Sequence, residues 1–249
     1  MEMKKILFVI ASFLFIFAFY NCSDSDSLTT KPPIITKPPI TVVNLPKQYN
    51  YLALGDSYTI GQSVCETCRF PEQLRKKLLE LNPKNTYSSK VIARTGWTTA
   101  DLISAINAEN PASNYDLVTL LIGVNNQYQN KPFLIYENEF PQLILKAITL
   151  AKGDKSNVIA VSIPDYAFTP FGKQSSNPSK ISAEIDIYNA FAQKYCLEQN
   201  IEFISITDIT RQGFINPNLV ATDDLHPSEL AYTQFVERIL PKALKAIRD

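Results

Sequence analysis

One serine and one histidine stand out as groups that could act together in catalysis. Ser57 follows Gly55 and Asp56 at the end of a compact apolar run, and His226 is the only histidine in the chain. A serine hydroxyl is a weak nucleophile at neutral pH and needs a base that removes its proton during attack. Imidazole titrates in the right range for this task. The pair predicts a serine nucleophile with a histidine base.

Asp223 is the candidate partner of this histidine, because it lies three residues before His226. A carboxylate at this spacing can hold one ring nitrogen, fix the tautomer and stabilise the imidazolium. Asp56 stands beside the nucleophile, but it is explained as an ordinary carboxylate at a helix entry and is left outside the catalytic set. The predicted catalytic residues are therefore Ser57, Asp223 and His226.

Two further polar stretches, at residues 94–97 and 123–126, have the same character as residues 55–57 and 223–226. Each contains glycine or small polar residues and follows an apolar run. Each alone has a structural explanation, because such residues are common in turns and aspartate favours helix starts. A shared site explains all four stretches at once.

The elements that must position these stretches alternate along the chain. The expected strands cover residues 49–54, 89–93, 116–122, 157–163 and 201–206. The expected helices cover residues 71–81, 99–108, 139–152, 181–200 and 227–248. This alternation predicts an α/β fold, a three-layer α/β/α sandwich around a five-stranded parallel sheet. Sites in such sheets form beyond the carboxyl ends of the strands, which is where the polar stretches lie.

Taken together, the four stretches resemble the SGNH (GDSL-like) hydrolase superfamily, which is named for a serine, a glycine, an asparagine and a histidine in four blocks. The matching residues here are Ser57, Gly96, Asn125 and His226, and the resemblance covers residues 50–249. It implies a flavodoxin-like fold and a carboxylic-ester hydrolase that works through an acyl-enzyme without a cofactor or metal. It also implies an oxyanion hole made by the backbone amides of Ser57 and Gly96 and the side-chain amide of Asn125.

The third block departs from the family pattern at Asn126, where an aspartate is usual. An amide keeps hydrogen bonds to the loop but loses the charge. We expect an effect on loop geometry or substrate preference more than on the chemistry, because the usual aspartate is not one of the catalytic residues.

Aromatic residues near these blocks are candidates for the wall of a substrate pocket. They are Trp97, Tyr128, Tyr166, Phe168 and Phe171. Aromatic faces pack on acyl groups and on sugars. The alternative is a loop that buries its own aromatic side chains.

The first residues have the pattern of a targeting signal. Lys4 and Lys5 precede an apolar run over residues 6–20, which is short for a membrane span and suits a signal peptide. Cys22 after this run resembles the lipidated cysteine of bacterial lipoproteins. We expect a signal peptide over residues 1–21, a lipid anchor at Cys22 and a location in the cell envelope. An ordinary signal peptide with an incidental cysteine and a single membrane anchor are the alternatives.

Residues 22–46 are rich in proline, serine and threonine and contain two near-copies of Lys-Pro-Pro-Ile. Proline fixes φ and removes backbone donors, so an extended tether is expected here. The predicted hydrolase domain covers residues 47–249.

Cys65 and Cys68 lie in the loop after the nucleophile, and we expect them to form a disulfide in an oxidising compartment. Two free thiols are the alternative. A metal site lacks further ligands at suitable spacing. Cys196 is expected to be a thiol in the core.

Lysine plus arginine equals aspartate plus glutamate at 24 each. This balance argues against a general nucleic-acid binder, which needs a concentrated positive field. The expected substrate is an acetyl ester of an exported or host carbohydrate. Lipid esters of the lysophospholipase or thioesterase type are the second choice, and a non-catalytic glycan-binding lipoprotein is the alternative of another class.

Overall fold

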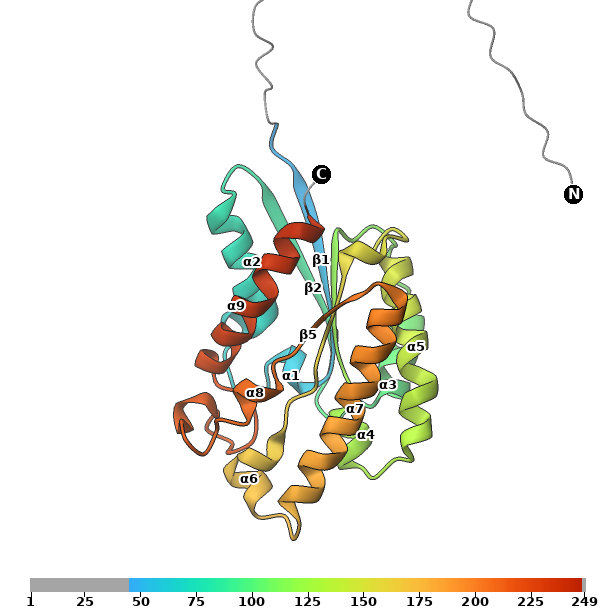
Figure 1. The fold of residues 1–249 in the computed structure, drawn as a ribbon. Coiled ribbons are helices and arrows are strands. Elements are labelled where there is room, and N and C mark those ends of the chain that lie inside the picture. Colours follow the sequence, from blue (N-terminus) through green and yellow to red (C-terminus); the bar gives the residue numbers. More distant parts are fainter. Residues whose placement is uncertain (1–44, 248–249) are drawn as a thin grey trace, which may run out of the picture. The chain divides into compact units, whose positions relative to one another are not determined.

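A computed structural model describes residues 45–247, so the predicted signal peptide, Cys22 and the tether up to residue 44 lie outside the described residues. Five parallel strands form one sheet in the order β2-β1-β3-β4-β5 (Figure 1). The strands are β1 Gln48–Gly55, β2 Thr86–Ala93, β3 Leu117–Leu121, β4 Val158–Val161 and β5 Glu202–Ile204. This is the flavodoxin-like order, which confirms the predicted fold class.

The central strands are largely apolar because both of their faces are covered. All five residues of β3 are buried, and β1 is buried from Tyr51 to its end. The one hydroxyl inside β3, on Thr119, is hydrogen-bonded to the hydroxyl of Tyr51 at 2.8 Å. β2 lies at an edge, and only Tyr87 and Ile92 of its eight residues are buried. The sheet is therefore the centre of the core, as a doubly covered parallel sheet requires.

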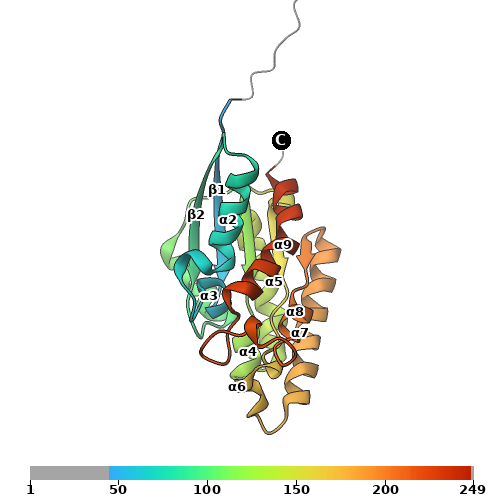
Figure 2. The ribbon, with the colours of Figure 1, turned by 90° about the vertical axis from the view of Figure 1, so that its left-hand side faces the viewer.

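Helices α2 and α9 cover one face of the sheet, and α3, α5 and α7 cover the other (Figures 1 and 2). The long helices are α2 Phe70–Leu81, α3 Thr99–Glu109, α5 Phe133–Leu150, α7 Pro178–Gln199 and α9 Glu229–Ala246. Short helices are α1 Ser57–Ile60, α4 Val124–Tyr128, α6 Pro170–Lys173 and α8 Thr207–Thr210. Within residues 45–247, none of the helices has the length and apolar character needed to cross a membrane.

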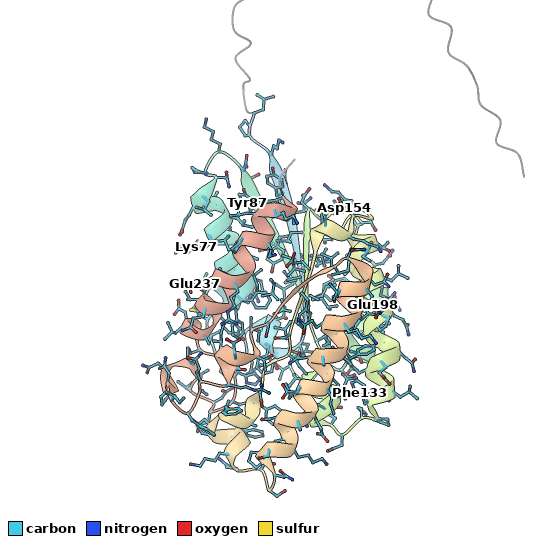
Figure 3. All side chains as sticks on the ribbon, in the orientation of Figure 1. Lys77, Tyr87, Phe133, Asp154, Glu198 and Glu237 are labelled. Atoms are coloured by element: carbon cyan, nitrogen blue, oxygen red, sulfur yellow. A yellow bond between two sulfur atoms is a disulfide. The ribbon has the colours of Figure 1, made fainter. Side chains whose placement is uncertain are left out.

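Helix α5 begins at Phe133, earlier than the predicted start at residue 139, because its first turns belong to an aromatic cluster against α7. The ring of Tyr188 lies 4.9 Å from that of Phe133 and 4.6 Å from that of Tyr136, measured between centroids. Side chains fill the layers on both faces of the sheet, with Phe133 labelled near this contact (Figure 3). Pro141 lies inside the helix. Burial of the cluster thus extends the helix on the N-terminal side of its predicted start at residue 139.

Helix α9 begins at Glu229, with Ser228 as its cap, and not at the predicted Pro227. Pro227 instead forms an isolated antiparallel bridge with Val220. The hydroxyl of Ser228 accepts the amide of Ala231 at 3.3 Å and supplies the helix cap. His226 therefore lies in a bridged loop before the helix.

Cys196 on α7 is wholly buried, as predicted for a core thiol. Burial raises the pKa of this thiol to about 12, so it stays neutral. It acts as a small apolar side chain in the packing of α7.

Candidate active site

One cavity of about 240 Å³ lies at the carboxyl ends of the central strands and brings the four sequence blocks together. Ser57, Gly96, Asn125 and His226 all contribute to its wall. The other residues of the wall are Tyr58, Thr95, Val124, Tyr128, Tyr166, Phe171 and Leu225. Residues from distant parts of the chain meet here because β2, β1 and β3 are neighbours and parallel.

The tight turn between β1 and α1 places Ser57 at the first position of a helix. A Cβ on Gly55 would lie 2.1 Å from Thr59 Oγ1 and 2.4 Å from the carbonyl oxygen of Leu121, so the turn requires glycine. Asp56 caps the helix, and its Oδ1 accepts the amide of Tyr58 at 3.0 Å. Ser57 itself is only 4% exposed. The turn therefore holds the hydroxyl at the wall of the cavity and largely away from bulk water.

Asp56 does not line the cavity. Its side chain is wholly buried, and Oδ2 has no hydrogen-bond partner among the described residues. Burial raises the pKa of this carboxyl to about 7, despite the hydrogen bond from Tyr58. Asp56 is thus the capping residue of α1, next to Ser57 in sequence, and its pKa is raised by burial.

Asp223 and His226 form a hydrogen-bonded pair on the other side of the cavity. His226 Nδ1 lies 2.6 Å from Asp223 Oδ2, and Oδ1 accepts the backbone amides of Leu225 and His226 at 3.0 and 2.9 Å. Burial alone would raise the pKa of Asp223, but its hydrogen bonds lower the pKa to about 2. The ionised carboxylate accepts a hydrogen bond from Nδ1–H, and in that tautomer Nε2 is left as an acceptor.

The backbone and ring of His226 are held by further contacts. Its carbonyl accepts the amide of Ala221 at 2.7 Å, next to the bridge between Val220 and Pro227. The ring of Tyr58 lies 5.1 Å from the imidazole, between centroids. These contacts fix where the imidazole stands relative to α1.

Ser63 is a site residue that the sequence did not predict. Its hydroxyl donates to Asp223 Oδ2 at 2.6 Å, so this oxygen accepts from both the serine and His226. Ser63 has a φ of 66° in the loop that follows α1. No sequence pattern connects Ser63 to a carboxylate so far along the chain. The contact is visible only after folding.

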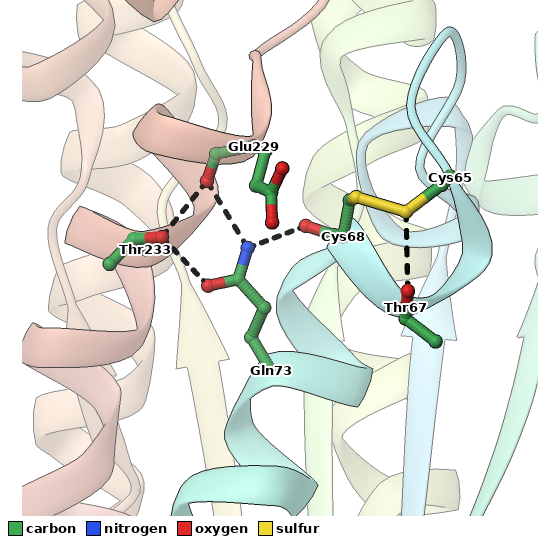
Figure 4. The surroundings of a disulfide bond; sticks show 6 residues. All are labelled: Cys65, Thr67, Cys68, Gln73, Glu229 and Thr233. Atoms are coloured by element: carbon green, nitrogen blue, oxygen red, sulfur yellow. Dashed lines mark hydrogen bonds between the residues drawn. A yellow bond between two sulfur atoms is a disulfide. The ribbon is translucent and has the colours of Figure 1, made fainter.

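The structure contains the predicted disulfide between Cys65 and Cys68. Gln73 ties this loop to the start of α9, because its Nε2 donates to the carbonyls of Cys68 at 2.6 Å and Glu229 at 3.1 Å (Figure 4). The hydroxyl of Thr233 donates to Gln73 Oε1 at 2.8 Å. Ser63 and Gln73 lie on either side of the disulfide in sequence. They contact the two ends of the segment that carries His226, since Ser63 binds Asp223 and Gln73 binds the carbonyl of Glu229.

Helix α4 fixes the loop that carries Gly96. Asn125 Nδ2 donates to the carbonyl of Trp97, and Gln129 Nε2 donates to the carbonyl of Gly96, each at 3.0 Å. Gly96 has a φ of 85°, in the left-handed region that glycine favours. The amide of Asn125 carries two hydrogens, and one remains for a ligand after the bond to Trp97.

Asn126 fastens α4 to the first turn of α3. Its Oδ1 accepts the amide of Thr99 at 3.0 Å, and its Nδ2 donates to the hydroxyl of Thr99 at 2.6 Å. That hydroxyl donates in turn to Glu139. A carboxylate at position 126 could not donate to Thr99, and it would place a second negative group beside Glu139. The asparagine therefore matches this network, which joins α4 to α3 and α5.

The predicted pocket aromatics divide into two groups. Tyr128, Tyr166 and Phe171 line the cavity, whereas Trp97 and Phe168 do not. Trp97 is half-buried against the core, and Phe168 packs on Phe214 with ring centroids 5.9 Å apart. Gly96, next to Trp97, and Tyr166, two residues before Phe168, line the cavity instead.

Among residues 45–247, no group of three or more histidine, cysteine, aspartate or glutamate side chains is placed to hold a metal ion.

Comparisons with known proteins show the family and the fold. The model of the GDSL-like Lipase/Acylhydrolase family matches residues 53–234. The acetylxylan esterase Axe2 from Geobacillus stearothermophilus is similar in structure, with a TM-score of 0.59 and 18% identity over 81% of this chain and 96% of that one. The lipase/acylhydrolase from Enterococcus faecalis has the same score and identity, over 78% and 94%.

A lipase from a goat rumen metagenome, Lip_vut3, gives a TM-score of 0.61 at 18% identity, over 78% of this chain and 97% of that one. No curated protein sequence matches the chain. At these identities the structural likeness establishes the shared fold.

Proposed function

The chain belongs to the GDSL-like lipase/acylhydrolase family, and on that premise we propose that it is a serine esterase that cleaves carboxylic esters through an acyl-enzyme. One observation carries the proposal: Ser57, Gly96, Asn125 and His226 line one cavity, and Asp223 is hydrogen-bonded to Nδ1 of the histidine. A nucleophile, a base and donors for an oxyanion are the parts that acyl transfer needs.

In the first half of the reaction, His226 Nε2 takes the proton of Ser57 as Oγ attacks the ester carbonyl carbon. The electron pair of the carbonyl moves to its oxygen, which accepts hydrogen bonds from the backbone amides of Ser57 and Gly96 and from Asn125 Nδ2. When the carbonyl re-forms, the alcohol leaves with the proton from Nε2. The acyl group stays on Ser57 Oγ.

In the second half, water takes the place of the alcohol and the acyl-enzyme is hydrolysed. Nε2 accepts a proton from the attacking water, and the tetrahedral oxyanion forms against the same donors. When the carbonyl re-forms, the bond to Ser57 Oγ breaks, Nε2 returns the proton to Oγ, and the carboxylic acid leaves. Asp223 remains ionised throughout, because its pKa is about 2, and it stabilises the imidazolium that forms in each half.

The acyl group of the proposed substrate is short, and acetyl is the first choice. The cavity of about 240 Å³ must hold both the acyl group and the ester oxygens, which leaves little room for a long chain. We propose an acetylated carbohydrate as the substrate. Lipid esters of the lysophospholipase or thioesterase type are the second candidate.

The proposed location is the cell envelope, with the chain attached to a membrane through a lipid at Cys22. The support is the basic and apolar run before this cysteine, together with a disulfide that suits an oxidising compartment. Incorporation of labelled palmitate into the wild-type chain, but not into Cys22→Ala, is the expected result.

The test of the reaction is hydrolysis of p-nitrophenyl acetate by the purified protein, with Ser57→Ala as the control. We expect the variant to lose at least a thousandfold in kcat, because it lacks the hydroxyl that forms the acyl-enzyme. A fluorophosphonate probe should label the wild type at Ser57 and leave the variant unlabelled. Equal turnover by the two proteins, with no labelling, would instead support a glycan-binding protein without activity.

A further inference from the structure

A second cavity, of about 450 Å³, adjoins the catalytic one. The two share three wall residues, Tyr128, Tyr166 and Phe171. The second cavity is formed by α4, the connection between α6 and α7, and the first turns of α7, which lie together at one end of the molecule (Figure 1). The two cavities are therefore adjacent, and these three side chains form their common boundary.

The walls of the second cavity are rich in amides and hydroxyls. These groups belong to Gln127, Asn130, Gln174, Ser175, Ser176 and Asn177. The two charged side chains of the wall, Lys180 and Glu184, lie 3.6 Å apart and neutralise each other. A neutral ligand with many hydroxyl groups matches such a surface, because it can donate to the amide oxygens and accept from the amide nitrogens.

The wall between the two cavities is held in place by hydrogen bonds. The hydroxyl of Tyr166 donates to Gln127 Oε1 at 2.9 Å, and Gln127 Nε2 donates to Glu184 Oε2 at 2.8 Å. Gln127 is only 6% exposed. This chain of bonds connects the loop after β4 to α4 and α7, so the wall is ordered before a ligand arrives, as an effective binding site requires.

Tyr128 offers an aromatic surface at the boundary. It is 52% exposed, although its ring packs 5.9 Å from that of Tyr166 and 6.2 Å from that of Phe171, between centroids. A large aromatic side chain that is supported by two others and still open to solvent can pack against the apolar face of a sugar ring.

A fatty acyl chain fits this second cavity poorly. It would cover amide and hydroxyl groups without hydrogen bonding to them, and burying polar groups in that way is unfavourable. A third cavity, of about 280 Å³, shares Gln127, Asn130 and Glu184 with the second and continues along α7. The succession of cavities suits a chain of linked units more than a single small molecule.

We propose that the second cavity is a saccharide subsite, which binds the sugar units next to the acylated one. The substrate is then a neutral acetylated oligosaccharide with two or more sugar units. This inference rests on the proposed esterase function, because the catalytic cavity fixes where the ester lies.

The test compares kcat/KM for acetylated sugars of one, two and four units with backbones of xylose, glucose or N-acetylglucosamine. For the wild type we expect kcat/KM to rise at least tenfold from one to four units on one of these backbones, mainly through a lower KM. Ser176→Trp places a bulky ring in the second cavity and should remove most of this rise. Ser179→Trp is the matched control, because Ser179 is exposed nearby and does not line the cavity.

Two results would overturn the subsite. One is the same kcat/KM for one and four units on all three backbones. The other is a rise in activity with acyl length, on p-nitrophenyl esters from two to twelve carbons, that Ser176→Trp removes, because the cavity would then hold the acyl chain. Failure of the esterase function is a separate result, in which p-nitrophenyl acetate is not hydrolysed and Ser57 is not labelled.

Discussion

The two sides of the catalytic cavity are held in place by different kinds of contact. Ser57, Gly96 and Asn125 follow three adjacent strands closely, so the sheet itself sets their positions. His226 comes long after β5 and is positioned by a few hydrogen bonds and one ring contact. The strand-end side, made of Ser57, Gly96 and Asn125, is therefore positioned by the core. The acid–base side, made of Asp223 and His226, depends on a few local contacts.

The largest effect is expected from removing the charge on the acid–base side. Asp223→Asn keeps the shape of the side chain but presents an amide to Nδ1, so the ring takes the wrong tautomer for a base. We expect kcat for p-nitrophenyl acetate to fall by about 10³–10⁴-fold. A fall of less than tenfold, with an unchanged circular dichroism spectrum, would mean that this carboxylate does not orient the histidine.

A smaller effect is expected from the strand-end side, where three proposed donors stabilise the oxyanion together. Asn125→Ala removes one oxyanion donor and should lower kcat by about 10²–10³-fold, with little change in KM. Gln129→Ala is the matched control, because it frees the carbonyl of Gly96 without removing a donor from the cavity. If both variants lose the same activity, Asn125 acts only by holding the loop.

The smallest effect is expected from Ser63, which acts through Asp223. Loss of its hydroxyl should raise the pKa of Asp223 from about 2 toward its usual value and lower kcat a few-fold at pH 7. The pKa of Asp223 is lower in the folded state, so the bond stabilises the fold above about pH 4, and this contribution is lost as the pH falls toward 2. Because both residues are partly exposed, we expect about 0.5–1 kcal/mol at pH 7.

Two variants separate the hydroxyl of Ser63 from its backbone strain. Ser63→Gly removes the hydroxyl and relieves the positive φ, whereas Ser63→Ala removes the hydroxyl alone. Both variants should lower kcat by the same factor. Guanidinium denaturation at pH 7 and pH 2.5 should show a loss in the free energy of unfolding relative to wild type, and this loss should be smaller at pH 2.5. Unchanged kcat in the glycine variant would show that the hydroxyl does not support the catalytic pair.

The contrast between the two sides also separates what could be predicted from what could not. The number of strands and their places along the chain followed from apolar runs such as the predicted strand at residues 116–122, since a strand covered on both faces is largely apolar. The start of α5 at Phe133 could not be predicted in this way, because it depends on aromatic contacts with α7. The loop before α9 was likewise read as helix, because the bridge of Pro227 to Val220 leaves no periodic pattern.

The sequence by itself determined the parallel sheet and the candidate residues at its strand ends. It could do so because parallel strands share one carboxyl edge, so polar residues that follow neighbouring strands must meet there. Only the tertiary structure decided which loop side chains support that edge: Ser63 on Asp223, Asn126 on Thr99, and Tyr128 and Tyr166 between the two cavities. Such contacts join loops that have no shared periodicity, and their geometry exists only once the helices have packed.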